Sequence, residues 1–518
     1  MPTLDWMTRG DDVRAADRVP YRLFEAQPRL DGGDADAANM LIQGDNLDAL
    51  KALLPFYAGR VKCIYIDPPY NTRSAFEHYD DNLEHAQWLA MIYPRLVLLR
   101  DLLAEDGSLW MQLDDNEAHY ARVVLDEVFG RSNFVADVIW HKSYAVRSNA
   151  QYFSTATEHI FVYAKSYSQL DLGSLPRSAE HEERYSNPDN DPRGPWQSVT
   201  MTISLVSGAR GRAYARTGTS PNLYTVTSPS GVQFDPPPGR CWSRLPDGFR
   251  ALDDDRRIWW GANGDRAPRL KMFLSEAAEG RIPTTLWSSG EDFGFNQQGV
   301  REVRALGLDF PSPKPERLLR SIINLASRPG ELVLDSFLGS GTTAAVAHKM
   351  GRRWIGIEMG DHAITHCKPR LDQVIAGEQG GISEAVGWSG GGGYRFYRLG
   401  EPVFDADGAI TASIRFPTLA AHVWFSETGT PYAGDGASAL LGVHEGTAYA
   451  LLYNGILGDR SVSGGNVLTS ALLARLRDDA GGWSGPTVIY GEASRLGAAR
   501  LKEAGVTFKQ TPYDVRAR

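Results

Sequence analysis

The positions of hydrophobic and polar residues follow a regular alternation between about residues 39 and 142. The short apolar runs with strand character are NMLIQGD, VKCIYID and SLWMQLDD. The segments between and after them have apolar residues at three-to-four spacing, typical of helices: LDALKALLPFYAG, HAQWLAMIYPRLVLLRDLLAEDG and NEAHYARVVLDEVFG. We expect Gly59 and Gly107 to end the first two helices. Strands that alternate with helices predict an α/β fold with a doubly wound parallel sheet.

This alternation stops at about residue 143 and resumes at about residue 311. Residues 143–310 are rich in Pro, Gly, Asn, Trp and Arg, and they are too long for a connection inside a compact domain. We therefore expect a separate domain there. Residues 311–385 return to helices and strands. Four glycines before residue 395 indicate the join to a last domain of mixed strands and helices over 395–518, and residues 1–38 read as a polar N-terminal arm.

One predicted strand ends in an uncommon way, in the stretch IYIDPPYNT. Proline cannot donate a hydrogen bond to a sheet, so the strand stops before Pro68 and Pro69. It then presents the carboxylate of Asp67 and the ring of Tyr70 at the carboxyl edge of the sheet. A tight turn explains such residues when they occur alone, whereas a second motif at the same edge favours a functional site.

The stretch ELVLDSFLGSGTTAAVAH supplies that second motif: a strand, a glycine-rich turn and a helix. Gly339 and Gly341 permit unusual φ values and a close approach of the backbone to a ligand. The start of the helix offers free N–H groups. The stretch is not a phosphate-binding loop, because no lysine follows Gly341, and Asp335 at the strand end suits a cationic ligand better than a phosphate. The next strand ends in Glu358, where ribose hydroxyls are commonly held.

The composition limits the possible partners. The chain has 518 residues and a formal net charge of −9, so binding to a nucleic acid requires a local basic surface. Its three cysteines, Cys63, Cys241 and Cys367, have no metal-site or thioredoxin spacing, which favours a reducing compartment and no structural zinc. No apolar signal segment or long uncharged apolar run occurs. We expect a soluble cytoplasmic protein that contacts no membrane.

A candidate basic surface lies in RRIWWGANGDRAPRLK, where basic side chains alternate with tryptophans. Arginine and lysine can contact phosphates, and aromatic rings can stack on bases. The alternative is an exposed charged loop around two core tryptophans. The residues that we predict to contact DNA are Arg256, Arg257, Trp259, Arg266, Arg269 and Lys271.

The order of the motifs, DPPY, FPSPKPERLL, DSFLGSGTT and GIE, resembles the circularly permuted β-group of amino-methyltransferases that act on DNA. The chain is most similar to the modification (Mod) subunits of Type III restriction–modification systems. That similarity rests on LIQGDNLDALKALLPFYAGRVKCIYIDPPYNT, NPDNDPRGPW, GGGGYRFYRLGEPVF and TFKQTPYDV, and it extends over nearly the whole chain. It implies a Rossmann-like sheet built from residues 39–142, the catalytic half, and residues 311–385, the cofactor half. The insert 143–310 becomes a target-recognition domain, and 395–518 serves dimerisation or partner contact.

The resemblance also assigns roles to single residues. It implies that S-adenosylmethionine is the cofactor and that Glu358 holds its ribose. Lys314 matches an element near the methionine carboxylate, and Asp45 matches an acid near the adenosine. The residues implied to surround the methionine part and backbone of the cofactor are Asp335, Phe337, Gly339, Ser340, Gly341 and Thr342.

The chemistry of an exocyclic amine fits the DPPY stretch. Its lone pair is delocalised into the ring, and hydrogen-bond acceptors aimed at its N–H groups free that lone pair toward a methyl group. Asp67 and the Pro68 carbonyl are suited to accept these bonds, and both prolines keep the backbone rigid. Tyr70 would stack on a base that is flipped out of the duplex.

The resemblance leads us to expect a homodimer that methylates adenine N6 in double-stranded DNA, as the modification and specificity subunit of such a system. It needs no metal. Two alternatives stay open: methylation of cytosine N4, and a recognition subunit whose main task is to place a partner helicase-nuclease.

Overall fold

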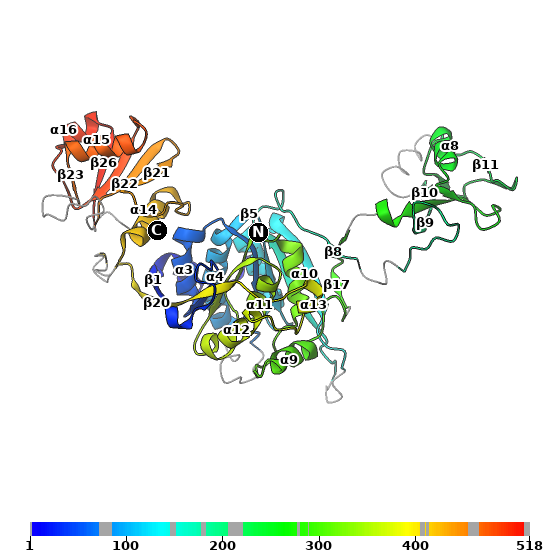
Figure 1. The fold of residues 1–518 in the computed structure, drawn as a ribbon, viewed down its shortest axis with the longest axis horizontal. Coiled ribbons are helices and arrows are strands. Elements are labelled where there is room, and N and C mark those ends of the chain that lie inside the picture. The colour runs from blue at the N-terminus through cyan, green and yellow to red at the C-terminus, as the bar shows by residue number, and fades with distance from the viewer. Residues whose placement is uncertain are drawn as a thin grey trace. The chain divides into compact units, whose positions relative to one another are not determined.

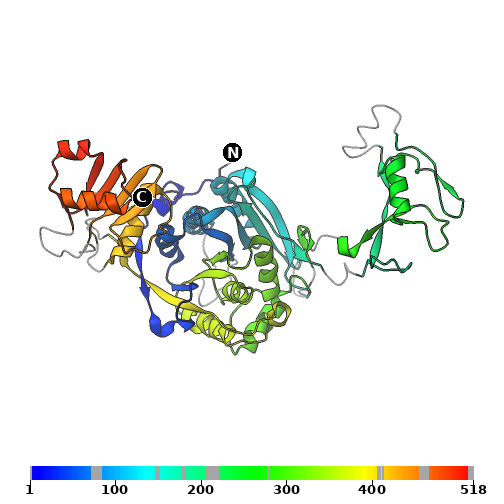
Figure 2. The ribbon, with the colours of Figure 1, turned by 45° about the horizontal axis from the view of Figure 1, so that its top comes forward.

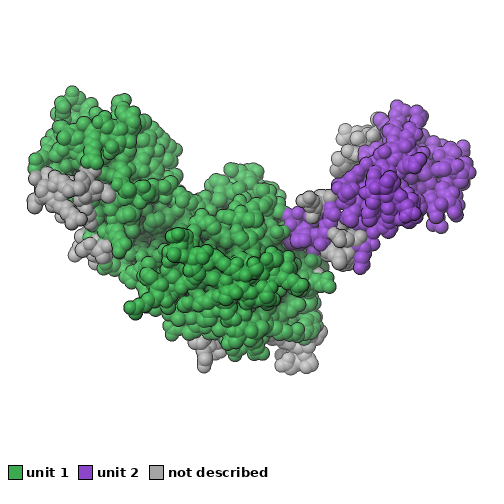
Figure 3. Space-filling view, in the orientation of Figure 1, with its two compact units in different colours: residues 1–173, 284–518 green, residues 174–283 purple. Residues whose placement is uncertain are grey.

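The structure is a computed structural model of residues 1–518. It describes residues 3–71, 85–145, 152–177, 183–205, 221–276, 280–288, 290–404, 410, 414–453 and 466–511. Two compact units are formed: Met1–Gly173 together with Thr284–Arg518 is the first, and Ser174–Pro283 is the second (Figure 3). Of the closing TFKQTPYDV motif, only the residues up to Thr511 fall within the described part.

The first unit is built on an eleven-stranded sheet with the order β1-β20-β3-β19-β18-β4-β5-β7-β6-β17, and β2 pairs with β20 at the side. Six neighbours in the centre run parallel, as predicted. They are β20 (Gly393–Pro402), β3 (Met40–Gln43), β19 (Arg353–Glu358), β18 (Leu332–Asp335), β4 (Val61–Ile66) and β5 (Leu103–Leu113). The antiparallel strands at the edges make the sheet mixed. They include β1 (Arg22–Ala26), β6 (Phe134–His141) and β7 (Thr157–Ala164).

Helices cover both faces of the sheet (Figure 1 and Figure 2). Helices α3 (Asn46–Tyr57) and α4 (His85–Leu102) connect β3 to β4 and β4 to β5, in one direction along the sheet. Helices α11 (Thr342–Lys349) and α12 (Lys368–Ile375) connect β18 to β19 and β19 to β20, in the opposite direction. Because crossovers between parallel strands are right-handed, the two pairs lie on opposite faces. The other helices around the main sheet are α5 (Ala118–Leu125), α9 (Asn296–Ala305), α10 (Glu316–Ala326) and α13 (Ser383–Val386), with π-helical turns at Asp126–Gly130 and Ala363–Cys367.

The strands β4 and β18 are the neighbours that matter for the site. Val333 pairs with Cys63 and Leu334 with Ile64, in parallel register. All six residues of β4 and all four of β18 are buried. Their carboxyl ends therefore deliver Asp67 and Asp335 to the same edge of the sheet.

The prediction that Gly107 ends a helix is wrong. Helix α4 ends at Leu102, and β5 begins at Leu103, so Gly107 lies inside a strand. A Cβ atom at Gly107 would lie 2.8 Å from the carbonyl oxygen of Val61 and 3.0 Å from that of Lys62. The glycine thus permits a close approach of β5 to β4, whereas Gly59, with φ +66°, does follow α3 as expected.

The expected boundaries 143–310 of the inserted domain are too wide, because the second compact unit covers only Ser174–Pro283. Strand β7 pairs with both β5 and β6, and β17 (Leu286–Trp287) pairs with β6, so these segments belong to the main sheet. The apolar run IFVYA of β7 is buried there. The proline- and glycine-rich composition of the surrounding segment hid a strand that continues the sheet.

The second unit has its own small core of Met201, Val226, Trp242, Phe249, Ile258 and Trp260. A three-stranded sheet is formed by β14 (Ile258–Trp259), β15 (Arg269–Phe273) and β9 (Trp196–Thr200), next to helix α8 (Pro246–Asp254). Two strand pairs complete it: β10 (Thr202–Ser204) with β13 (Arg240–Trp242), and β11 (Val226–Thr227) with β12 (Gln233–Phe234). At its ends, β8 (Leu175–Pro176) pairs antiparallel with β16 (Gly280–Arg281).

The boundary predicted at residue 395 also needs correction, because β20 lies inside the main sheet and pairs with β3. Beyond it, a four-stranded sheet contains β21 (Leu440–His444), β22 (Thr447–Leu451), β24 (Thr487–Gly491) and β26 (Val506–Gln510). The other elements of this C-terminal region are α14 (Phe416–Thr428), α15 (Ser470–Asp479), α16 (Ala498–Glu503) and the paired strands β23 (Val467–Leu468) and β25 (Ala493–Ser494). Phe416 and Leu419 of α14 belong to the same hydrophobic core cluster as Leu50 and Leu53 of α3.

The N-terminal residues are more ordered than a polar arm. They form α1 (Arg9–Asp12), α2 (Ala15–Arg18), β1 and β2 (Gly32–Gly33), and Trp6 and Tyr21 are buried in the main core. Within the described ranges, no helix is both long enough and apolar enough to cross a membrane.

Candidate active site

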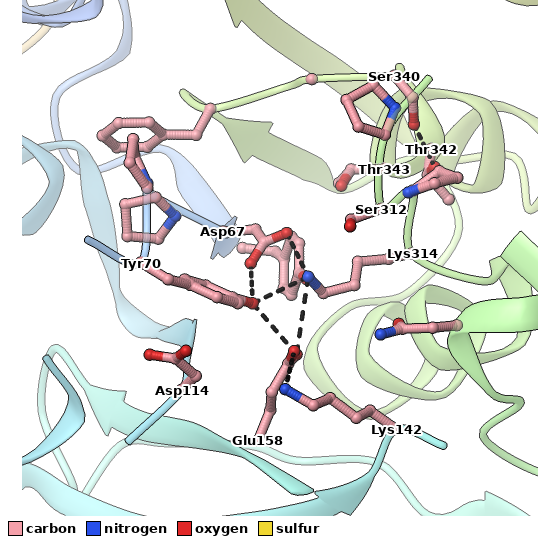
Figure 4. Close-up of a pocket in the computed structure, with 18 of the residues that line it drawn as sticks. Asp67, Tyr70, Asp114, Lys142, Glu158, Ser312, Lys314, Ser340, Thr342 and Thr343 are labelled. Carbon is pink, nitrogen blue, oxygen red and sulfur yellow. Dashed lines mark hydrogen bonds and ion pairs between the residues drawn. The ribbon is translucent and has the colours of Figure 1, made fainter. Parts of the chain in front are cut away.

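A cavity of about 550 Å³ lies at the carboxyl edge of the sheet, and it joins the two motifs (Figure 4). From the end of β4 it is lined by Asp67, Pro68, Pro69 and Tyr70. From β18 and the turn after it come Asp335, Phe337, Leu338, Gly339, Ser340, Thr342 and Thr343. The segment Phe310–Lys314 and the side chains Tyr65, Asp114, Asp115, Asn116, Lys142, Thr155, Glu158, Asn296 and Leu319 close the remaining walls.

The DPPY corner is held from several sides. The hydroxyl of Tyr70 donates to Asp67 Oδ1, and the indole Nε1 of Trp88 donates to the Pro69 carbonyl over 2.7 Å. Asn71 adopts a left-handed conformation with φ +57°, and its amide donates to Glu117 Oε1 over 2.6 Å. A non-glycine residue with positive φ is uncommon, so these contacts fix a backbone that would otherwise relax.

Lys314 lies against this corner. Its ammonium is 2.6 Å from Asp67 Oδ2 and 2.9 Å from the Tyr70 oxygen. The enclosed surroundings raise the pKa of Asp67 above its ordinary value, and the Lys314 charge partly offsets this. For Lys314, burial opposes the charged form, but Asp67 and Glu158 together raise its pKa, so it stays an ammonium.

A second buried carboxylate, Glu158, lies on the other side of Lys314 and Tyr70. Its Oε2 is 3.1 Å from the Tyr70 oxygen and 3.7 Å from the Lys314 ammonium, and it accepts a 2.6 Å hydrogen bond from Gln112. Its Oε1 is 3.2 Å from the ammonium of Lys142. Burial disfavours the ionised form, but the two lysines outweigh it and lower the pKa of Glu158.

The glycine turn has the conformation that its sequence requires. Gly339 has φ +56° and Gly341 has φ +80°, and α11 begins directly after Gly341. The Gly339 N–H donates to Glu358 Oε2 over 2.6 Å, and the Cys367 thiol donates to the Gly339 carbonyl over 3.1 Å. These bonds connect the glycine turn to the end of β19 and to the π-helical turn Ala363–Cys367.

Asp335 ends β18 and faces the cavity floor. It accepts hydrogen bonds from the Phe337 N–H over 2.9 Å and from the Thr343 hydroxyl over 2.6 Å. Burial raises the pKa of Asp335 to about 7, because these two donors are neutral and offset only part of the cost of desolvation. A cationic ligand next to this carboxyl would favour its ionised form.

Asp45 follows the end of β3, where Gln43 pairs with Glu358 and the Gly44 N–H donates to the Glu358 carbonyl over 3.1 Å. The Asp45 carboxylate caps helix α3 by accepting a 2.7 Å bond from the Leu47 N–H, and it pairs with Arg95 at 3.1 Å. Asp45, Gly341 and Glu358 are not among the residues that line the cavity, whereas the other predicted cofactor residues are. The neighbouring Asn46 makes the connection instead, because its amide donates to the Ser336 carbonyl over 2.6 Å.

Sequence reasoning missed Lys142 and Glu158. Glu158 lies in the segment 143–310 that we assigned to the inserted domain, and Lys142 is the last residue of the segment 39–142 that we assigned to the catalytic half. The available signal was Glu158 itself, a charged residue at the start of the apolar run TEHIFVYA. A carboxylate is rarely buried in a strand without partners, and here the partners are two lysines.

The predicted DNA-contacting residues all lie in or next to the small sheet of the second unit, but they differ in accessibility. Arg256, Arg266 and Arg269 are exposed. Arg257 Nη1 lies 2.7 Å from Glu276, and the Trp259 ring packs 5.2 Å from that of Trp196.

Lys271 is a correction to that set. It is 4% exposed, and its ammonium is bound by Asp189 and, at 2.9 Å, by Asp191. Both acids belong to the NPDNDPRGPW motif. The motif and Lys271 therefore stabilise this unit from inside, and the lysine has no exposed charge for a phosphate.

The arrangement is a mixed α/β fold in which one cavity, at the carboxyl edge of the parallel strands, is lined by both the DPPY corner and the glycine turn. Residues 61–368 match the family model described as DNA methylase. Since this match covers more than half of the chain, the protein belongs to the DNA methylase family. Within the described residues, no group of three or more His, Cys, Asp or Glu side chains is arranged to hold a metal ion.

Two curated relatives are Mod subunits. The probable Type III restriction-modification enzyme HindVI Mod subunit of Haemophilus influenzae is 30% identical over 428 residues, which is 72% of this chain and 55% of the relative. The Type III restriction-modification enzyme StyLTI Mod subunit of Salmonella typhimurium is 32% identical over 338 residues, 59% of this chain and 49% of the relative. The chain thus spans about half the length of these relatives. Among solved structures, the cytosine-N4-specific PvuII DNA methyltransferase is similar with 15% identity and a TM-score of 0.36, over 68% of this chain and 91% of that chain.

Proposed function

We propose that the protein transfers a methyl group from S-adenosylmethionine to the N6 amine of adenine, in a base flipped out of double-stranded DNA. The observation that carries this proposal is the shared cavity: Asp67 and Tyr70 from the end of β4 line it together with Asp335 and Gly339 from the end of β18. Membership of the DNA methylase family supports the reaction class.

The cavity suits this cofactor. The two hydrogen-bond donors to Asp335 described above, the Phe337 N–H and the Thr343 hydroxyl, are both neutral. The pKa of Asp335 is raised by burial, so a cationic ligand beside it would stabilise its ionised form. Phe337, Gly339 and Thr342 line the same wall and would hold the cofactor's methionine part and backbone. Glu358, which does not line the cavity but accepts a hydrogen bond from the Gly339 N–H, is our candidate for the ribose. When bound, S-adenosylmethionine supplies a methyl group activated by a sulfonium.

The DPPY corner would bind the amine. Asp67 and the Pro68 carbonyl accept its N–H bonds, which favours a pyramidal nitrogen with its lone pair available. The positive charge that develops on nitrogen is stabilised by the Asp67 carboxylate. The Tyr70 ring, held through its hydroxyl by Asp67 and Glu158, would stack on the flipped base, a contact worth roughly 1–3 kcal/mol.

The relatives named as Mod subunits support a modification and specificity subunit of a Type III-like restriction–modification system. A homodimer, a cytoplasmic location and a partner helicase-nuclease belong to the same proposal. The exposed arginines of the second unit, Arg256, Arg266 and Arg269, are our candidates for contacts to DNA phosphates. Cytosine N4 is the alternative target, because it is also an exocyclic amine.

Host DNA provides the test. The protein and its Asp67→Asn variant are expressed in a host without DNA methylation, and the DNA is sequenced by a modification-sensitive method. We expect N6-methyladenine in one fixed short sequence, lost in the variant. The matched control is Asp126→Asn, a buried carboxylate that accepts from Tyr163 over 2.6 Å and Arg122 over 2.9 Å and is not among the residues that line the cavity. N4-methylcytosine would establish the alternative, and an unmarked genome with soluble protein would contradict a methyltransferase.

A further inference from the structure

Both oxygens of the Asp67 carboxylate are occupied in the structure. Tyr70 donates to Oδ1, and the Lys314 ammonium lies 2.6 Å from Oδ2 (Figure 4). A carboxylate oxygen can accept more than one hydrogen bond, so a target amine that donates to Asp67 either shares an oxygen with one of these donors or displaces it. A displaced ammonium in a buried site is costly unless another anion receives it.

Glu158 is placed to receive both donors. Its Oε2 is within 3.1 Å of the Tyr70 oxygen, so the single phenol proton can point to either carboxylate. The same oxygen is 3.7 Å from the Lys314 ammonium, which leaves that ammonium between two anions, closer to Asp67. A small movement of the Tyr70 hydroxyl or of the Lys314 ammonium therefore moves its contact from Asp67 to Glu158, and the donor still has a carboxylate as its partner.

The surroundings of Glu158 keep it charged and fixed. Glu158 is 3% exposed. Its Oε2 accepts a hydrogen bond from the Gln112 amide, and its Oε1 pairs with the Lys142 ammonium. Gln112 is held in turn by the Tyr65 hydroxyl over 2.7 Å. Strands β5 and β7, the segment after β6 and the segment before α10 each contribute one member, so the group does not depend on a single loop.

We propose that Glu158 is a positioning residue that takes over the Lys314 ammonium and the Tyr70 hydroxyl when the target amine binds, and so frees Asp67 to accept the amine. This inference rests on the proposed methyltransferase function. The atoms balance without any covalent step, because only hydrogen-bond partners are exchanged. After methyl transfer, Asp67, which accepts the hydrogen bond of the amine in this proposal, receives the proton that the methylated nitrogen must lose.

The test compares Glu158→Gln, which keeps the volume but loses the charge, with Glu158→Asp, which keeps the charge. In Glu158→Gln the Lys314 ammonium has only Asp67 as an anion and competes with the amine. We expect the single-turnover methylation rate to fall about tenfold to a hundredfold. The dissociation constants for S-adenosylmethionine and for DNA should stay within about twofold, because neither ligand is proposed to touch Glu158. Glu158→Asp should recover a substantial part of the lost rate.

The pH profile provides a readout that a purely structural role would not change. The titratable groups that face Asp67 are Lys314, Glu158, Tyr70, which donates to it, and Asp335 at the end of the neighbouring strand. The Glu158 charge raises the pKa of Asp67, so its removal should move the acid limb of the rate profile to lower pH while the plateau falls. Asp126→Asn, which changes a buried carboxylate outside the cavity, should leave the acid limb of the rate profile at the same pH.

The outcomes separate this inference from the function on which it rests. If the wild-type protein does not methylate DNA, the proposed function fails. If the wild-type methylates and Glu158→Gln has the same plateau and the same acid limb, the proposed role of Glu158 is overturned. A slower Glu158→Gln variant with an unshifted limb, and no recovery in Glu158→Asp, would also overturn it, because that pattern indicates a packing defect.

Discussion

At the scale of single residues, the site depends on how charges are paired in a dry cavity. Asp67 and Glu158 share Lys314, whereas Asp335 has only neutral hydrogen-bond donors in its immediate contacts. The cost of burying a carboxylate falls when an ammonium accompanies it. Asp335 is therefore the acid in this site whose ionisation depends most on what binds beside it.

The first prediction concerns this acid. The pKa of Asp335 is about 7 in the folded protein, against 3.8 for a free side chain, because of burial. A raised folded pKa means that the stabilising contribution is complete below pH 3.8 and is lost as the pH rises through about 7. Between pH 5.5 and pH 8, we expect the wild type to lose up to about 2 kcal/mol more free energy of unfolding than Asp335→Asn.

Urea denaturation of the ligand-free protein at both pH values measures this difference. The comparison with Asp335→Asn cancels the other titrating groups, because both proteins share them. Equal losses of stability in the two proteins would show that Asp335 is already ionised when the site is empty. In that case its hydrogen bonds to Phe337 and Thr343 outweigh burial.

At the scale of elements, the ends of strands that are marked by proline or glycine could be predicted from the sequence. The Pro68–Pro69 corner and the turn around Gly339 and Gly341 are local signals, and the structure places both at the edge of the sheet where they were expected. Partners that are distant in sequence were not predictable. Lys271 had the pattern of an exposed cation, but two acids of a motif about 80 residues earlier bury it.

The strand β7 illustrates the same limit. Its apolar run is a clear strand, but nothing local tells whether it joins the main sheet or an inserted domain. The choice is made by its antiparallel pairing with both β5 and β6, which is a tertiary fact. The end of α4 was missed for a similar reason, because the close contact of β5 with β4 requires a glycine that looked like a helix cap.

The glycine turn before α11 yields the second prediction. Gly341→Ala forces an alanine to φ +80°, and the new Cβ lies 3.3 Å from the Cys367 Cα, a backbone atom that can yield only slightly. Gly351→Ala is the matched control, with φ +69° and nothing within 4 Å of its Cβ. Both variants pay about 1 kcal/mol or more for the left-handed conformation.

Only Gly341→Ala should also weaken S-adenosylmethionine binding, because its turn must open where Gly339 and Thr342 line the cavity. We expect at least about a tenfold loss of affinity, equivalent to about 1.4 kcal/mol, by isothermal titration calorimetry. Equal cofactor affinity in the two variants would mean that the turn adapts without moving its cavity side.

At the scale of the whole molecule, the C-terminal region and the second unit differ in whether they can be removed without exposing the main core. The C-terminal region shares the main core, since Phe416 and Leu419 belong to one cluster with Leu50 and Leu53 of α3. The second unit has a separate core around Trp242 and Trp260. We therefore expect removal of the second unit, but not of the C-terminal region, to leave a folded cofactor-binding protein.

The last prediction uses the base of the second unit, where Pro176 and Gly280 are opposite each other in antiparallel register. Because partners in such a pair can be joined by a two-residue turn, residues 177–279 can be replaced by Asn-Gly. We expect this variant to unfold cooperatively and to bind S-adenosylmethionine within about twofold of the wild type. Its affinity for duplex DNA, measured by fluorescence anisotropy at fixed salt, should fall at least about a hundredfold, because the exposed arginines of the unit are lost.

A chain that ends at residue 402 is the contrasting variant, because it uncovers Leu50 and Leu53 beside the missing α14. It should be insoluble or should melt well below the wild type. The two deletions together locate DNA binding. If the protein without residues 177–279 keeps its DNA affinity, the phosphate contacts lie on the first unit, around the mouth of the cavity, and Arg256, Arg266 and Arg269 then have no part in recognition.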